Sequence, residues 1–531
     1  MPLFMRLRIG YSFPQARERL RAVRVTLMQL ANTRRLNGRK PHGHGPGPVR
    51  GSHVRRWPLA ACLLLTACCG VAETPRVPDP KDNGPIVDVH CHLFNAKDLP
   101  VAGFLRAQGV PGFLALLVDR IIQGQTDGTR SAAAVKDRTQ PSDEEIDRVL
   151  EAVQVELEGE SAVRVEAETR EQAAERAELV EALAGGQGVA RVGPRGTWGV
   201  IRRHARWAIL LTAGTQEIAR RMLGAYPDVA LFTPCLMDME HWFNDSVGRS
   251  FEDQIAVAEQ AMTLAPGRIH PFLAYDPERA RWVRAAKLDP LDLVRKALSK
   301  GFVGIKVYPP LGYRPTRNTN DPMAGPRGKA WDDELEALFA FCEAEEVPIG
   351  AHCEDPGAAS SPAAGKYADP RGWDTVLAKH CKLRLNLMHF GGDTDLIERG
   401  VSSWAWHIGQ LVQKYPHVYA DIGAHESLFD ECQRADFLGG VEKIRQAVPA
   451  IGDHLMYGSD WHMIVRHPTE QRFLVDALEH MRHVERRRFA GGAALDYLGL
   501  LPGGKNRARL RTFYETKGWR LPSWWVEPGT P

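Results

Sequence analysis

The stretch GPIVDVHCHLFN, residues 84–95, places Asp88, His90 and His92 at alternate positions of a predicted strand. The segment is rich in β-branched and apolar residues and follows an Asn-Gly-Pro turn signal. Alternate side chains of a strand share one face, so these three side chains are expected to point the same way. Two imidazoles on one face can bind a single metal ion. The stretch therefore predicts a strand that carries part of a metal site.

A His-x-His pair alone is weak support for a metal site, because the chain contains 19 histidines. A second pair, His42 and His44, lies in the Gly- and Pro-rich KPHGHGPGP, where no strand is predicted to orient it. The interpretation of His90 and His92 consequently depends on further ligands at suitable positions elsewhere in the chain.

Length and composition indicate a globular protein with a large core. The chain has 531 residues, of which 44% are hydrophobic and 25% are charged, and its net charge is +3. This length suits either several ordinary domains or one large α/β barrel with additional segments. The small net charge gives no reason to expect nucleic acid as a partner.

The N-terminal part of the chain differs from the rest in charge. Glu18 is the only acidic residue before Glu73, while arginine is abundant. We interpret residues 1–53 as a basic leader, which would not be translated if synthesis started at Val54.

Residues 54–68, VRRWPLAACLLLTAC, have the order of a secretory signal, with a basic start followed by an apolar run. The run is shorter than the roughly 20 residues that span a bilayer. The ending resembles a bacterial lipobox, which implies that Cys68 is lipidated and becomes the mature N-terminus. We therefore expect an exported, membrane-anchored lipoprotein; the alternative is an apolar strand or short helix in an N-terminal domain.

After a linker at 69–83, eight apolar segments alternate with helical patterns. They are residues 85–94, 228–239, 269–277, 302–310, 347–354, 384–392, 418–425 and 454–462. This alternation predicts an α/β fold, a parallel (β/α)8 TIM barrel, within residues 84–531. Residues 95–225 form a long, mainly helical insertion after the first strand, and we expect it to cap the C-terminal face of the barrel.

Polar residues occur where the predicted strands end. They are His90, His92, Lys306, His352, His389 and Asp460. The active sites of such barrels lie at the C-terminal ends of the strands, so these side chains are expected to converge. The segments DVHCH, GIKVYPP, IGAHCE, NLMHFGG and MYGSDWH, in this order, resemble the amidohydrolase superfamily. Within it they are similar to the second amidohydrolase family, which includes aminocarboxymuconate-semialdehyde decarboxylase and related hydrolases.

This resemblance implies that His90, His92, His352 and Asp460 bind a single divalent ion, with zinc the expected metal. It implies that His389 orients water and substrate, and that Asp460 also acts in catalysis. Imidazole and carboxylate ligands suit zinc, which lowers the pKa of bound water from 15.7 to about 7. A neighbouring carboxylate can then accept a proton and pass it to the leaving group.

Two residues have more than one interpretation. Lys306 could be carbamylated and bridge two metals, bind a substrate carboxylate, or pair with a neighbouring acid. Asp88 could be a buried structural carboxylate or could support a ligand. Loop residues after the strands could shape specificity or simply pack against the insertion; they are Asp238, Glu240, His241, Trp242, Tyr308, Tyr313, Arg314, Trp461 and His462.

The sequence thus predicts a metal-dependent hydrolase that uses metal-activated water on an amide, ester or lactone bond of a small molecule. The first alternative is a non-oxidative decarboxylase that uses the same site. The second is a binding lipoprotein without catalysis, which would have no need of the complete ligand set. The substrate and the oligomeric state do not follow from the sequence.

Overall fold

The computed structural model describes residues 84–107, 206–355, 359–361, 363–467, 469–481 and 483–525. The predicted leader, signal segment and linker lie outside these residues, and so does most of the predicted insertion, from residue 108 to 205. The predictions for those segments, including the lipid anchor and the cap, stay predictions. Within the described ranges, no helix combines the length and the apolar character needed to cross a membrane.

Eight short strands form the centre of the fold. They are β1 (Ile86–Cys91), β2 (Val229–Pro234), β3 (Phe272–Ala274), β4 (Gly304–Val307), β5 (Ile349–His352), β6 (Leu385–Met388), β7 (Val418–Asp421) and β8 (Leu455–Met456). Strands β3 to β8 form one parallel sheet in chain order, and β1 pairs with β2, also in parallel. Each strand lies within one of the eight predicted segments, so the predicted parallel α/β arrangement is confirmed.

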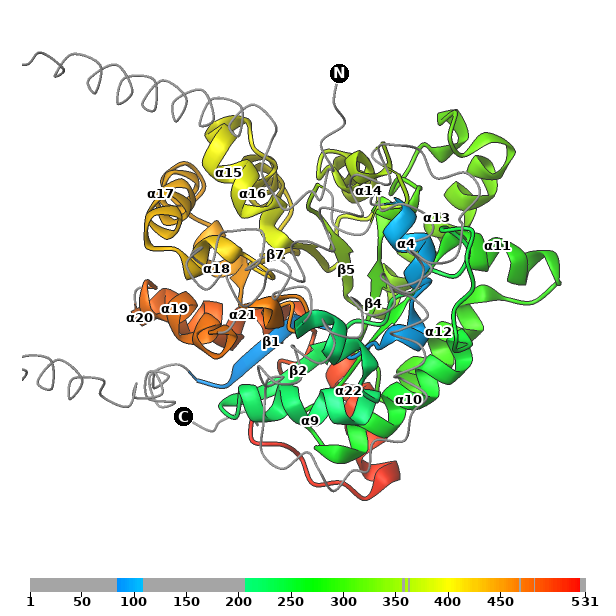
Figure 1. Cartoon of the computed structure of the whole chain (residues 1–531), viewed down its shortest axis with the longest axis horizontal. Helices are drawn as coiled ribbons and strands as arrows, with labels where there is room; N and C mark the ends of the chain where they lie inside the picture. The colour runs from blue at the N-terminus through cyan, green and yellow to red at the C-terminus, as the bar shows by residue number, and fades with distance from the viewer. Residues whose placement is uncertain are drawn as a thin grey trace, which may run out of the picture. The chain divides into compact units, whose positions relative to one another are not determined.

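Isolated bridges join these two sheets on both sides. Cys235, directly after β2, is bridged in parallel to Phe272 of β3, and Cys91 of β1 is bridged to Trp461 beyond β8. The strands therefore follow one another in a closed ring. Figure 1 shows the strands in the middle with helices around them.

The helices follow the strands as the sequence patterns predict. They are α9 (Thr215–Ala225), α10 (Phe251–Leu264), α11 (Pro277–Ala285), α12 (Pro290–Ser299), α13 (Gly328–Glu345), α14 (Gly372–Lys379), α15 (Asp393–Arg399), α16 (Trp404–Lys414), α17 (Glu431–Ala447), α18 (Ile451–His454), α19 (Phe473–Glu479), α20 (His483–Arg487), α21 (Ala493–Tyr497) and α22 (Lys505–Lys517), with the short α4 (Val101–Ala107) after β1. An Asp-Pro pair begins both α11 and α12. In each case the aspartate side chain accepts hydrogen bonds from the first turn, and proline occupies a position where no N–H is needed.

The interior of the ring is filled by side chains. Every residue of β5, β6 and β7 is buried, as expected for parallel strands that are covered on both faces. Gly350 faces Met388, and a Cβ at this glycine would lie 2.2 Å from the methionine Cε. Glycine therefore fits β5 because the neighbouring strand's side chain occupies the space.

The strands are shorter than the predicted segments, because the chain turns at their C-terminal ends. His389, predicted to lie within a strand, instead begins a short turn after β6 and has a φ of +66°. Asp460, predicted to end the eighth strand, lies in a loop four residues beyond β8 and has a φ of +50°. These turns begin loops, and the loops bring polar side chains to one end of the ring.

Candidate metal centre

The predicted site residues from β1 and the β8 loop meet in a buried group. The Nε2 atom of His92 lies 3.2 Å from Asp460 Oδ1, and the Nε2 atom of His90 lies 3.7 Å from the same oxygen. His90, Asp460 and His389 each offer a ligand atom within 4.8 Å of the other two. The Nε2 atoms of His90 and His92 thus lie near one carboxylate oxygen, and the assignment of these residues as metal ligands stays a prediction.

Hydrogen bonds fix the orientation of the imidazoles. Nδ1 of His92 donates to the backbone carbonyl of Cys235 at 2.8 Å, and Nδ1 of His389 donates to the carbonyl of Gly423 at 2.9 Å. A carbonyl oxygen can only accept, so the proton resides on Nδ1 in both rings. Each Nε2 consequently carries a lone pair, as a metal ligand requires.

Asp421, at the end of β7, fixes the orientation of the His90 ring, because its Oδ1 accepts a hydrogen bond from Nδ1 of His90 at 3.1 Å. The carboxylate also accepts from the side-chain amide of Asn386 at 2.7 Å and from the backbone N–H of Gly423 at 2.9 Å. Burial alone would raise the pKa of Asp421, but the neighbouring His90 and these donors hold that pKa well below its usual range. Sequence reasoning missed Asp421, because it lies inside the predicted segment 418–425 and only the structure shows that β7 ends at this residue.

The donor set fits a divalent cation. Asp460 Oδ1 is buried and has no hydrogen-bond donor among the described residues, although two imidazole nitrogens lie close to it. Lone pairs of His90, His92 and Asp460 therefore face one another without a proton between them, which is unfavourable unless a cation is bound. Two imidazoles and a carboxylate are ligands of zinc and similar ions.

Removing the charge of Asp421 should weaken metal binding. We expect Asp421→Asn to lower metal affinity by about 10- to 100-fold, because a carboxylate behind a ligating histidine both orients the ring and raises its basicity. Competition with a chromogenic chelator measures this change. The exposed Asp333 of α13, which pairs with Lys329, provides the control Asp333→Asn, and equal affinities for the two variants would contradict the role of Asp421.

His352 lies in a second group that shares His389. His352, Glu354 and His389 offer ligand atoms within 4.8 Å of one another, and the ring centroids of the two histidines are 4.4 Å apart. Nε2 of His352, however, donates to the carbonyl of Glu354 at 3.1 Å. The structure thus does not place His352 among the atoms around Asp460, whereas His389, expected to orient water, belongs to both groups.

Glu354 was not singled out from the sequence, although it lies two residues after His352 in IGAHCE. Its Oε2 atom is 3.5 Å from Nδ1 of His389. Burial, together with the nearby Asp393 and Asp460, raises the pKa of Glu354 well above its usual range. The Glu354 side chain is 33% exposed, so it lies at the edge of the group rather than inside it.

The side chain of Lys306, on β4, lies next to His90. Its Nζ atom lies 3.4 Å from Nε2 of His90 and 2.5 Å from Sδ of Met388, and burial lowers the pKa of its ammonium group. Within the described part of the chain, Lys306 makes no ion pair. The structure therefore gives no support to pairing with a neighbouring acid, and carbamylation and binding of a substrate carboxylate remain open.

Asp88 supports the loop that carries Asp460. The Asp88 carboxylate accepts from the hydroxyl of Ser459 at 2.6 Å, from the backbone N–H of Ser459 at 3.0 Å, and from the N–H of His90 at 3.2 Å. Burial raises the pKa of Asp88 to about 7, although these donors act in the opposite direction. Both interpretations of Asp88 therefore apply, because this buried structural carboxylate also positions Ser459, the residue before Asp460.

His462 ties the same loop to two other segments. Nδ1 of this buried ring accepts from the indole N–H of Trp207 at 2.9 Å, and Nε2 donates to the carbonyl of Phe94 at 2.8 Å. The φ angle of His462 is +110°, a conformation that persists only where the surroundings enforce it. Trp207 lies in the described part of the predicted insertion, and this hydrogen bond joins it to the loop that carries Asp460.

Most other loop candidates pack against one another. Asp238 and Glu240 both accept from the guanidinium of Arg279, at 2.5–2.9 Å and 2.6 Å, and the indole of Trp242 donates to Asp276 at 3.0 Å. Of the others, Tyr313 accepts from the backbone N–H of Tyr308, His241 is exposed and Trp461 is buried.

Residues 215–500, more than half of the chain, match the sequence model of the family described as Amidohydrolase. The chain belongs to this family. The match begins after β1, so His90 and His92 lie outside it, and their inclusion in the site depends on the geometry above. No protein of curated function matches this amidohydrolase significantly.

Several solved structures resemble this amidohydrolase distantly. They include an amidohydrolase from Burkholderia multivorans with bound zinc (16% identity, 53% of this chain and 87% of that chain, TM-score 0.35), a probable 2-pyrone-4,6-dicarboxylic acid hydrolase from Acinetobacter baumannii (11%, 53% and 88%, 0.35) and a dihydroxybenzoic acid decarboxylase from Polaromonas with bound manganese (13%, 61% and 95%, 0.35). Likenesses at these scores are too distant to indicate a reaction or a metal for this chain.

Proposed function

We propose that this amidohydrolase is a metal-dependent hydrolase that cleaves an amide, ester or lactone bond of a small molecule. The observation that carries this proposal is the buried Oδ1 atom of Asp460, which has no hydrogen-bond donor among the described residues and lies beside the Nε2 atoms of His90 and His92. A buried carboxylate oxygen without a donor costs stability, so its presence here points to a function that uses it.

The residues that would hold the ion are His90, His92 and Asp460, with His389 at the edge of the same group. Zinc suits this donor set, and when bound it polarises a carbonyl and makes water acidic enough to act as a nucleophile near neutral pH. A neighbouring second group contains His352 and Glu354, whose ligand atoms approach those of His389.

The chain's own residues supply the proton transfers. Burial by itself raises the pKa of Asp460, but His90 and His92 hold that pKa well below its usual range, so the carboxylate is ionised at neutral pH. It can accept the proton of the attacking water and return it to the leaving group. Burial lowers the pKa of His389 to about 3, so this ring is neutral and its Nε2 can accept a hydrogen bond from water or substrate.

Lys306 favours the second candidate, a non-oxidative decarboxylase. A buried ammonium group 3.4 Å from Nε2 of His90, without an ion pair in the described chain, could bind a substrate carboxylate. The two reactions differ in their products, since hydrolysis incorporates oxygen from water and decarboxylation releases carbon dioxide.

A panel of esters, lactones, amides and aromatic carboxylates separates these candidates. Turnover in ¹⁸O-labelled water should give a product with one labelled oxygen and no carbon dioxide, and a chelator should abolish it. Release of carbon dioxide without incorporation of label would favour the decarboxylase. Binding of such compounds without any turnover would favour the non-catalytic alternative.

We also propose that the mature protein is anchored at Cys68. Expression from Val54 onward should give a membrane-associated, lipidated protein, because a basic start, an apolar run and Leu-Thr-Ala-Cys occur in order. Cys68→Ala should block processing, whereas Cys69→Ala serves as the control and should still be processed. Detection of residues 1–53 on the native protein by intact-mass measurement would contradict the anchor.

A further inference from the structure

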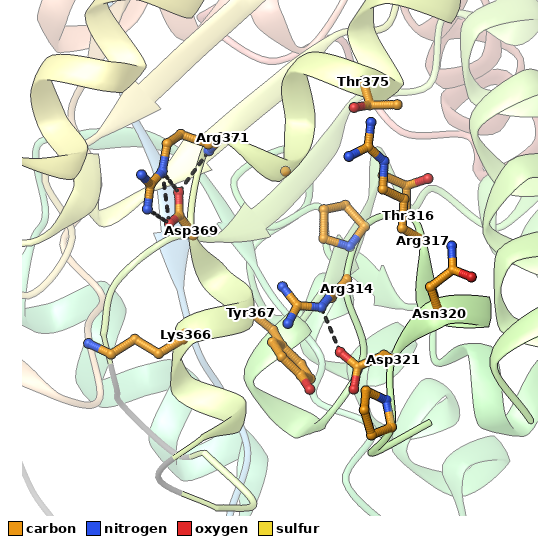
Figure 2. A pocket seen from close by; sticks show the side chains of 13 residues that line it. Arg314, Thr316, Arg317, Asn320, Asp321, Lys366, Tyr367, Asp369, Arg371 and Thr375 are labelled. Carbon is orange, nitrogen blue, oxygen red and sulfur yellow. Dashed lines mark hydrogen bonds and ion pairs between the residues drawn. The ribbon is translucent and has the colours of Figure 1, made fainter. Parts of the chain in front are cut away.

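A cavity of about 550 Å³ lies between the loop after β4 and the segment after β5. Its polar lining includes Arg314, Arg317, Asn320, Lys366, Arg371 and Thr375, which Figure 2 shows around the opening. The candidate metal ligands and their neighbours, here called the metal group, are His90, His92, His389 and Asp460. None of these residues lines the cavity. The mechanism proposed above leaves it without a role.

The lining is strongly cationic. Four cationic side chains and only two carboxylates, Asp321 and Asp369, line the cavity, an excess of two positive charges in a chain whose net charge is +3 over 531 residues. Arg371 pairs with Asp369, and Lys366 pairs with Asp355 outside the lining. Arg317 makes no ion pair with any residue that the structure describes, so its charge is available to a ligand.

Arg314 is held in a defined orientation at the cavity wall. Its Nε atom donates to Asp321 at 2.6 Å, and its guanidinium lies over the ring of Tyr367, 4.1 Å from the ring centroid. Figure 2 shows the Nη edge of this guanidinium turned away from Asp321. A guanidinium fixed in this way loses little freedom when it binds a ligand.

The loop that carries both arginines is rigidly built. The buried side chain of Asn318 accepts from the N–H of Arg314 at 2.7 Å and donates to the carbonyl of the same residue at 2.9 Å. Asp332 of α13 accepts from the backbone N–H groups of Asn318 and Thr319, both at 2.9 Å. Arg317 adopts a left-handed conformation with φ 66° and ψ 27°. A non-glycine residue keeps this conformation only where its surroundings impose it, and here it accompanies an unpaired guanidinium at a cavity.

We propose that this cavity is an oxyanion-binding site for the carboxylate or phosphate group of a small molecule, separate from the metal group. Guanidinium groups present parallel N–H donors that match the oxygens of both groups. The hydroxyl of Thr375 and the amide of Asn320, which also line the cavity, offer further donors. Pro315, Pro322 and the ring of Tyr367 give the cavity an apolar wall for the body of such a ligand.

Calorimetric titration of the full chain with inorganic phosphate and with succinate, at low ionic strength, tests this site. The informative variant is Arg317→Asn, because asparagine tolerates the left-handed backbone and removes only the guanidinium. Lys287→Asn is the matched control, since Lys287 is another exposed cation with a positive φ, 63°, and does not line the cavity. We expect Arg317→Asn to weaken binding by about tenfold, the effect of losing a charge-assisted hydrogen bond, and Lys287→Asn to leave it unchanged.

Two further results decide the proposal. Binding should persist after the protein has been treated with a chelator, because the cavity contains none of the metal group; loss of binding on chelation would show that the anion binds the metal instead. Absence of binding by both anions, or equal weakening in Arg317→Asn and Lys287→Asn, would also overturn it. Tighter binding of phosphate would identify a phosphorylated ligand, and tighter binding of succinate a carboxylic acid.

Discussion

Asp460→Asn is expected to lower kcat by about 10²- to 10⁴-fold, the range for loss of a positioned general base. Asparagine has almost the same shape but cannot accept and return a proton. The hydrogen bond from the backbone N–H of residue 460 to the carbonyl of His90, 2.6 Å long, does not involve the side chain and should persist. The fold should therefore remain intact, as thermal unfolding can verify.

The exposed Asp453 of α18, which has a side-chain exposure of 68%, provides the control for this experiment. Asp453→Asn should retain the wild-type kcat and the wild-type unfolding temperature. A kcat for Asp460→Asn within a few fold of the control would mean that another group carries out the proton transfer, and Glu354, 3.5 Å from His389, would be the next candidate.

The second large effect is expected from His92→Ala, which should remove bound metal and activity together. The variant loses the Nε2 ligand of His92 and, among the described residues, a single hydrogen bond from Nδ1 to the carbonyl of Cys235. His90→Ala is a less clear test, because it would remove a hydrogen-bond donor of the buried Asp421 carboxylate and should itself destabilise the fold by about 1.5–3 kcal/mol. Metal content by mass spectrometry and kcat are measured on the same sample.

His480→Ala serves as the control, because His480 is exposed at the end of α19. It should retain both metal and activity. If His92→Ala bound metal as tightly as this control, the ligand set around Asp460 would be wrong.

The strands could be predicted well from the sequence, because parallel strands that are buried on both faces consist of nearly continuous apolar residues. Residues 349–351 and 385–388 are all buried, and each of these two segments is followed directly by a histidine. Because the C-terminal ends of parallel strands meet at one end of a barrel, those histidines could be placed together without knowledge of any contact.

The remaining features of the site depend on contacts between distant residues, and no local pattern encodes them. His90 and Asp421 are 331 positions apart in the chain, and the carbonyl of Cys235 that orients His92 is available only because of the path of β2. The orientation of His352 toward the carbonyl of Glu354 follows from the turn after β5. A prediction from strand ends places residues in the same region but does not assign ligand atoms.

The cationic cavity illustrates the same limit. Arg314 was expected to be a loop residue that either shapes specificity or packs against the insertion, and the structure shows it over Tyr367 from the segment after β5. Arg317 and Arg371 come from different loops, and only the packing of these loops brings them to one cavity. Its charge therefore could not be recognised from either segment alone.

We propose that activity depends on a metal ion held by His90, His92 and Asp460. The most direct test is to measure metal content and turnover on one sample, before and after removal of the metal with a chelator, and again after zinc is restored. We expect a single divalent ion per chain, loss of turnover when it is removed and recovery when zinc is restored. A second ion of similar occupancy would favour a carbamylated Lys306 and contradict the mononuclear site, and full turnover in a sample without metal would contradict the mechanism itself.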